Sequence, residues 1–282
     1  MAERDVQGKG SRQPSNLVLR VASAAVLAPL AFGVAWFGGW PFALFWTLAG
    51  VAVVWEWVAM IAGQGNRLLF SAGAGAVVAA AFIAQSARPV AAIVVIALGA
   101  LAVFVLAPMR RGLWMATGVG YAGALALAPL YLRQDAQWGF IAIALVFVVV
   151  WMTDILGYFG GRAFGGPKLA AAISPKKTWS GALAGAFGAI ALTAVGAHYI
   201  LGQASLAILV LALGLSIASQ AGDLLESAIK RKFGVKDAGS LIPGHGGVMD
   251  RLDGFWTAVL MAAAIGITRG GFEAPGRGLL LW

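Results

Sequence analysis

The sequence contains no cysteine and very little charge. Without cysteine there are no disulfide bonds, no thiolate catalysis and no cysteine-ligated zinc. Charged residues make up only 11% of the chain and apolar residues 61%, whereas an ordinary soluble domain is roughly 25% charged. A water-soluble protein of this size could not bury so much apolar surface, so we expect the bilayer to be part of its solvent.

An apolar signal segment is also missing from the N-terminus. Residues 1–16 are polar and charged, so no cleavable signal peptide is expected. The net charge of +9 would suggest nucleic acid for a soluble protein. In a membrane protein it is typical of the positive-inside bias, so no nucleic-acid partner is expected.

Long apolar runs dominate the rest of the chain. A helix needs about 20 apolar residues to cross the hydrocarbon region, and nine stretches approach that length. They predict an all-α, polytopic integral membrane protein with about nine transmembrane helices. Their approximate bounds are 17–38, 40–61, 68–86, 89–107, 113–132, 138–158, 181–201, 204–228 and 254–268. We therefore divide the chain into a polar tail (1–16), a transmembrane domain (17–268) and a short C-terminal tail (269–282).

Basic residues are distributed unevenly around these spans. With a cytoplasmic N-terminus, 16 of the 20 Lys and Arg residues lie on the cytoplasmic side. The other four are Arg88, Arg133, Arg269 and Arg277. This bias predicts a cytoplasmic N-terminus in the inner (cytoplasmic) membrane, with the loops 159–180 and 229–253 facing the cytoplasm.

Acidic residues are scarce, and four lie in or at the ends of apolar spans. These are Glu56, Asp154, Asp223 and Glu226. A carboxylate inside a membrane is costly, so each is a candidate functional residue. The alternative is that each ties helices together through an ion pair or hydrogen bond. The roles of Glu56 and Glu226 stay open.

The densest polar segment runs from Ser219 to Asp253. Its carboxylates Asp223 and Asp250 can hold a hard divalent cation such as magnesium, which prefers oxygen ligands. A cationic patch between them can neutralise phosphates, and a glycine-rich loop lets backbone N–H groups approach phosphate oxygens. We interpret the segment as a site of phosphoryl or nucleotidyl transfer at the membrane surface.

Each part of this segment also has a plain structural interpretation. Lys230, Arg231 and Lys232 can simply mark the cytoplasmic side. Asp253 can be only the N-cap of the ninth helix. His245 can be a turn residue whose imidazole is satisfied locally. The complete ordered string is much harder to explain in this way.

That string resembles the signature of the phosphatidate cytidylyltransferase family. An earlier segment, residues 154–179, is similar to a cytoplasmic loop of the same family, and Trp55-Glu56-Trp57 is similar to a family Glu-Trp pair in an early span. Clear resemblance covers about residues 150–260. The residues that carry it are Ser227, Lys230, Arg231, Lys236, Asp237, Pro243, His245, Gly246, Gly247, Asp250, Arg251 and Asp253, and before them Asp154, Tyr158, Arg162, Ser174, Lys176, Lys177 and Thr178.

The resemblance implies an enzyme that joins CTP to phosphatidic acid, giving CDP-diacylglycerol and pyrophosphate. In the family, magnesium is held by the two aspartates that match Asp223 and Asp250, and a monovalent cation such as K+ is associated with the same site. The implied catalytic residues are these aspartates with Lys230, Arg231, His245 and Arg251. The remaining matched residues of both segments, apart from Pro243, would bind substrate. The resemblance also allows a homodimer.

Two departures and two rival functions accompany the resemblance. Ser180 stands where the family usually has Glu or Gln, and Gly157 stands where Ala is common. A related CTP-dependent enzyme that acts on another lipid, such as a polyprenol kinase, would share much of the chemistry. A secondary transporter would share the intramembrane carboxylates and glycines, but it would not require the loop that ends in Asp250-Arg251.

Overall fold

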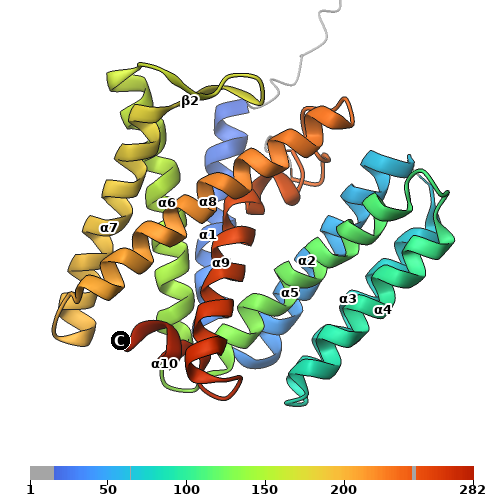
Figure 1. Cartoon of the computed structure of the whole chain (residues 1–282), viewed down its shortest axis with the longest axis horizontal. Coiled ribbons are helices and arrows are strands. Elements are labelled where there is room, and N and C mark those ends of the chain that lie inside the picture. The colour runs from blue at the N-terminus through green and yellow to red at the C-terminus, as the bar shows by residue number, and fades with distance from the viewer. Residues whose placement is uncertain (1–15, 64, 243–245) are drawn as a thin grey trace, which may run out of the picture.

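The fold is a bundle of long helices (Figure 1), in a computed structural model that describes residues 16–63, 65–242 and 246–282, with side chains from residue 25 onward. Within the described residues the only sheet is a two-stranded antiparallel hairpin. The elements are α1 (Asn16–Phe37), α2 (Gly39–Ala62), α3 (Arg67–Gln85), α4 (Pro89–Leu106), α5 (Gly112–Gln134), α6 (Gly139–Phe164), β1 (Lys168–Ala170), β2 (Ser174–Thr178), α7 (Trp179–Leu201), α8 (Leu206–Lys232), α9 (Met249–Gly270) and α10 (Pro275–Leu280).

Eight of these helices, α2 to α9, are long and apolar enough to cross a membrane, which confirms the all-α polytopic class. The helix α1 occupies the place of the first predicted span, and its described apolar part, Ala25–Phe37, is shorter than a span. Three helices that carry motif residues run beyond the predicted apolar stretches. They are α6, α8 and α9, whose ends extend into polar sequence.

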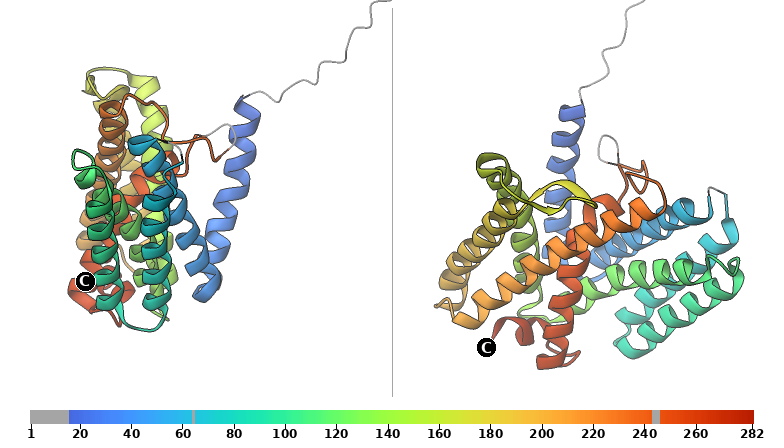
Figure 2. Two further views of the ribbon diagram at one scale, coloured as in Figure 1. Left: turned by 90° about the vertical axis from the view of Figure 1, so that its right-hand side faces the viewer. Right: turned by 45° about the horizontal axis from the view of Figure 1, so that its top comes forward.

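The helices alternate in direction, which gives the bundle two distinct ends (Figure 1). The upper end in Figure 1 carries the β1–β2 hairpin, the C-terminal end of α8 and the start of α9. The lower end carries α10 and the C-terminus. In the side view of Figure 2, α1 stands at the edge of the bundle, and its principal contacts are with α2 and α6.

Glycines bring α6 and α7 close together. A Cβ added at Gly181 would lie 2.6 Å from the carbonyl oxygen of Gly157, and one at Gly185 would lie 2.5 Å from that of Thr153. Small residues at such positions let membrane helices approach closely. The contact fixes the spacing of two walls of the candidate site.

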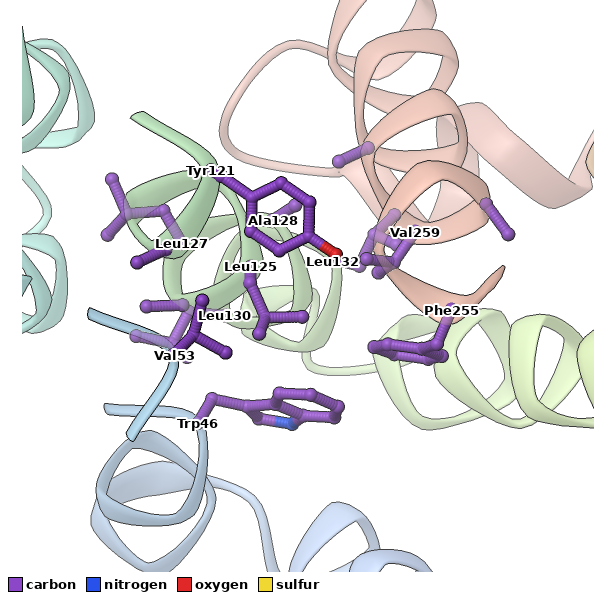
Figure 3. Close-up of a cluster of buried hydrophobic side chains, with 14 of the residues drawn as sticks. Trp46, Val53, Tyr121, Leu125, Leu127, Ala128, Leu130, Leu132, Phe255 and Val259 are labelled. Atoms are coloured by element: carbon purple, nitrogen blue, oxygen red, sulfur yellow. The ribbon is translucent and has the colours of Figure 1, made fainter. Parts of the chain in front are cut away.

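Stacked aromatic rings link α2, α5, α6 and α9 in the core, and Figure 3 shows Trp46 of α2 beside Phe255 of α9. Trp46 stacks on Phe255 with ring centroids 4.7 Å apart, and Phe255 lies 5.2 Å from Phe147. Tyr121 stacks on Trp256 at 4.3 Å. These contacts hold α9, which begins in the motif loop, against the centre of the bundle.

Candidate active site

A polar cavity of about 430 Å³ lies between α6, α7, α8 and the hairpin. Both sequence segments singled out above contribute to it, although they are far apart in the chain. The predicted site residues that line it are Asp154, Tyr158, Arg162, Lys176, Lys177, Thr178 and Asp223. Gln220, which the sequence did not single out, lines it as well.

The helix α6 supplies one wall of this cavity. It continues to Phe164, so Asp154, Tyr158 and Arg162, which are four residues apart, share one helix face. The Arg162 guanidinium donates a hydrogen bond to the Tyr158 hydroxyl at 3.1 Å. This face presents an acid, a phenol and a cation to the same space.

The hairpin and the start of α7 supply the opposite wall. Pairing of Lys168 with Thr178 and of Ala170 with Ser174 sets the hairpin register. The Thr178 hydroxyl accepts the N–H of Gly181 at 3.2 Å and so caps α7. Ser174 begins β2 but does not line the cavity.

The two departures from the family pattern lie beside this wall. Ser180 bonds the carbonyl oxygen of Gly165 and the Thr178 hydroxyl, so its short side chain ties the start of α7 to the end of α6. A Cβ at Gly157 would lie 3.5 Å from the Gly181 carbonyl oxygen, an ordinary contact. Alanine at that position would therefore fit this fold too.

Lys177 and Asp223 form an ion pair across the polar cavity, with both side chains about a quarter exposed. Ser227 lies one turn further along α8, and its hydroxyl donates to Asp223 Oδ1 at 3.4 Å. The predicted metal ligand Asp223 is thus accessible from the cavity.

A second cavity, of about 500 Å³, lies between α1, α2, α6 and α9 and is mostly apolar. Leucine, alanine, phenylalanine and tryptophan side chains form most of its wall. Arg251 and Asp154 are its charged lining residues. Because Asp154 lines both cavities, it marks the place where they meet.

Charged groups from three other elements act on Asp154 at this junction. Its carboxylate interacts electrostatically with Asp223 of α8 and Asp253 of α9, and with the cations Lys177 of β2 and Arg251 of α9. The three carboxylates repel one another, and the two cations offset part of that repulsion.

Asp250 is held differently from Asp223. Its Oδ2 accepts the N–H groups of Ala238 and Gly247 at 2.8 Å each, and its Oδ1 accepts Lys230 Nζ at 2.6 Å. Lys230 also lies 3.2 Å from Glu226 Oε1. Lys230 is therefore placed between two carboxylates, and it does not line either cavity.

The loop between α8 and α9 carries the remaining matched residues. Lys236 and Asp237 are exposed on it, and Arg231, at the end of α8, donates to the Val235 carbonyl oxygen at 3.1 Å. Gly246 has φ +87°, which favours glycine. Pro243 and His245 lie outside the described residues.

The start of α9 excludes the structural interpretation of Asp253 as a helix N-cap. The helix begins at Met249 with Val248 as its N-cap, so the idea that Asp253 only caps the helix is wrong. Asp253 lies inside α9, where its carboxylate interacts with those of Glu226 and Asp223. The apolar pattern missed this because the first turn of α9 is polar.

The donor set fits a hard cation only in part. Among the described residues, no three Asp, Glu or His side chains form a ready metal site. Buried Glu226 pairs with Lys230, both oxygens of Asp250 accept hydrogen bonds, and Asp223 faces the cavity. Magnesium commonly binds one or two carboxylates and completes its shell with water and substrate phosphates, so Asp223, which faces the cavity, fits such an ion.

Comparison with known proteins agrees with the geometry. A profile of the cytidylyltransferase family matches residues 18–267. A phosphatidate cytidylyltransferase of Brucella abortus biovar 1 (strain 9-941) is 40% identical over 253 residues, covering 89% of this chain and 94% of the relative. That of Haemophilus influenzae is 40% identical over 143 residues, covering 49% of this chain and 50% of the relative. Phosphatidate cytidylyltransferase 5, chloroplastic, of Arabidopsis thaliana is 44% identical over 131 residues, covering 45% of this chain and 32% of the relative.

Proposed function

This chain belongs to the cytidylyltransferase family, and from that premise we propose that it transfers the cytidylyl group of CTP to phosphatidic acid. The products are CDP-diacylglycerol and pyrophosphate, so the protein is a nucleotidyltransferase of phospholipid biosynthesis. The Brucella relative, matched over nearly its whole length, is named for this activity.

The meeting of the two cavities at Asp154 carries the proposal. One cavity has cations and hydroxyls in its wall beside two carboxylates, as a nucleoside triphosphate with its magnesium ion requires. The other is apolar and lies between membrane helices, as acyl chains require. A reaction between a water-soluble nucleotide and a membrane lipid needs both kinds of space around one reacting centre.

CTP would occupy the polar cavity. Lys176, Lys177 and Arg162 line it and can neutralise triphosphate oxygens, with Arg162 able to form two parallel bonds. The Tyr158 hydroxyl, already bonded to Arg162, can add a further donor. These side chains would bring the α-phosphate toward Asp154.

Phosphatidic acid would occupy the apolar cavity. Its acyl chains would lie among the side chains of α1, α2, α6 and α9, and its phosphate would bind Arg251 at the charged end. Because α1 packs chiefly on α2 and α6, a lipid could reach this space from the bilayer beside α1. This arrangement places the attacking phosphate next to the nucleotide cavity.

Magnesium would be held by Asp223 and Asp250, with a monovalent cation such as K+ nearby. When bound, magnesium acts as a Lewis acid that stabilises negative charge on the phosphates. Lys177 and Lys230 pair with these two aspartates, and each ammonium group offsets a carboxylate charge in the bundle. The lysines thereby hold both acids at defined positions.

The chain's own residues then have little covalent chemistry to perform. A phosphate oxygen of the lipid attacks the α-phosphorus of CTP, the bond from that phosphorus to the bridging oxygen breaks, and pyrophosphate leaves. The attacking oxygen is largely ionised near neutral pH, so no strong general base is needed. The cations align the two phosphates and neutralise the developing charge.

Orientation and assembly belong to the same proposal. The motif loops and the hairpin lie at one end of the bundle, which we assign to the cytoplasm, where CTP is found. The four basic residues assigned to the other side include Arg269 and Arg277 near the C-terminus. The homodimer that the resemblance allows stays a prediction, which mass measurement of the detergent-solubilised protein would test.

An assay with several lipid phosphates tests the substrate assignment. Purified protein is incubated with labelled CTP, magnesium and, separately, phosphatidic acid, a polyprenol, a polyprenol phosphate or no lipid. We expect CDP-diacylglycerol from phosphatidic acid alone. Labelled product from a polyprenol or its phosphate would favour the related lipid enzyme, and no product from any lipid would overturn the assignment.

A further inference from the structure

Glu56 caps the helix that carries the second aspartate. It lies in α2 and is buried, with only 1% of its surface exposed. Its Oε1 accepts the N–H of Val248 and its Oε2 accepts the N–H of Met249, each at 2.8 Å. The N-cap residue Val248 has no side-chain cap of its own, so Glu56 supplies the acceptors that the first turn of α9 lacks.

Two glycines leave room for this carboxylate. A Cβ at Gly247 would lie 2.6 Å from both Glu56 carboxylate oxygens, and one at Gly239 would lie 2.8 Å from Oε1. Any larger residue at either position would displace Glu56 or the loop. The middle and the end of the α8–α9 loop are thus built around this one side chain.

Asp250 completes the same network. While Glu56 accepts the N–H groups of Val248 and Met249, Asp250 accepts those of Ala238 and Gly247. Two carboxylates therefore hold the middle of the loop and its end at α9. A shift of Glu56 would move the backbone that orients Asp250.

The position of α2 around Glu56 is fixed by hydrogen bonds and ring contacts of the neighbouring residues. Next to it, Trp57 donates a hydrogen bond to the Trp114 carbonyl oxygen at 2.7 Å and lies 5.5 Å from the Tyr121 ring. Trp256 of α9 donates to the Tyr121 carbonyl oxygen at 2.9 Å. The helices α2, α5 and α9 are thereby tied together within two turns of the cap.

We propose that Glu56 is a positioning residue for the cytidylyl transfer. It fixes the first turn of α9 and, through it, the places of Asp250 and Arg251. Both of its oxygens accept backbone N–H groups, so it acts through the loop rather than on a substrate. The inference rests on the proposed function, because it concerns the geometry of that reaction.

Glu56→Gln tests the role with little change in shape. The amide keeps one acceptor but turns an NH2 group toward a backbone N–H, so one of the two bonds is lost. Substitution of a residue that orients a functional group typically lowers activity about 10- to 100-fold. We therefore expect kcat of Glu56→Gln to fall by a factor in that range. The KM for CTP should change less than about two-fold, because neither Glu56 nor the backbone that it holds lines the polar cavity.

Hydrogen–deuterium exchange supplies a readout that does not depend on activity. In Glu56→Gln, exchange should rise in peptides covering residues 238–250 and stay unchanged in α3 and α4. Asp135→Asn is the matched control. Asp135 is also a buried cap, which accepts the N–H groups of Gln137, Trp138 and Arg277 at the other end of the bundle. It should change exchange only there and leave kcat within about two-fold.

The outcomes separate the two claims. If the unsubstituted enzyme makes no CDP-diacylglycerol, the proposed function fails and the positioning role fails with it. If that enzyme is active and Glu56→Gln matches it in kcat and in exchange, the positioning role alone is overturned. A rise in exchange throughout the bundle would show that Glu56 serves general stability, which also contradicts the inference.

Discussion

Individual carboxylates in this bundle have two kinds of environment. Glu56 and Asp250 accept backbone N–H groups and hold the α8–α9 loop. Asp154 and Asp223 face the polar cavity and have cationic neighbours. The division separates acids that shape the site from acids that a substrate or an ion can reach, and Lys230 links Asp250 to a further acid, Glu226.

Asp223→Asn and Asp250→Asn should each lower turnover by about 100-fold or more, the usual cost of a charge-stabilising group. Kinetics at saturating magnesium would measure this. The double variant should be little worse than either single variant, because both residues serve one site. Near-full magnesium-dependent activity in either single variant would show that its aspartate is not a ligand.

The two aspartates should differ in their effect on structure. Asp250→Asn weakens its bonds to the loop and to Lys230, so thermal unfolding should show a lower Tm. Asp223→Asn should leave the Tm nearly unchanged, since that residue faces a cavity.

Lys177→Met should raise the KM for CTP by about 10-fold, because a hydrogen bond to a charged group contributes about 1.5–3 kcal/mol. Lys232→Met is the matched control. Lys232 lies 4.5 Å above the Trp114 ring and lines neither cavity, so its KM for CTP should stay close to that of the unsubstituted enzyme. Equal KM values in the two variants would remove Lys177 from the nucleotide site.

At the scale of elements, much of the fold was predictable and much of the site was not. Apolar runs predicted the positions of the long helices, because burial in lipid leaves a local signal. The β1–β2 hairpin and α10 have no such signal. The bonds from Glu56 to Val248 and Met249 join residues more than 190 positions apart, so they follow from helix packing, which a single sequence does not display.

Packing of α6 on α7 sets the width of the polar cavity. Gly185→Ala would place a methyl group 2.5 Å from the Thr153 carbonyl oxygen, and overpacking of this kind typically costs about 1–3 kcal/mol. We expect a lower Tm and a higher KM for CTP. Gly196→Ala, on the same helix with nothing within 4 Å, should change neither, and equal Tm values for the two variants would contradict the close contact.

For the whole molecule, the central expectation is a bundle with its motif end in the cytoplasm. The family match covers residues 18–267, so the catalytic unit and the membrane unit are the same bundle. Lipid chemistry in such a protein requires no separate soluble domain. The polar cavity must therefore open toward the compartment that holds CTP.

The lack of cysteine makes this orientation easy to test, since any introduced thiol is the only one. Met109→Cys places a thiol between α4 and α5 at the motif end, where Met109 is 99% exposed. Gln203→Cys places one between α7 and α8 at the other end. In intact spheroplasts a membrane-impermeant maleimide should label Gln203→Cys and spare Met109→Cys until lysis. The reverse labelling pattern would show that the motif end of the bundle faces away from the cytoplasm.

The position of the transferred label tests the account most directly. Purified protein receives phosphatidic acid, magnesium and CTP labelled either at the α-phosphate or at the γ-phosphate. Cytidylyl transfer should place the α label in the lipid fraction and release the γ label as pyrophosphate. The γ label in the lipid would show a kinase, and no label in the lipid from either nucleotide would contradict nucleotidyl transfer at the junction of the two cavities.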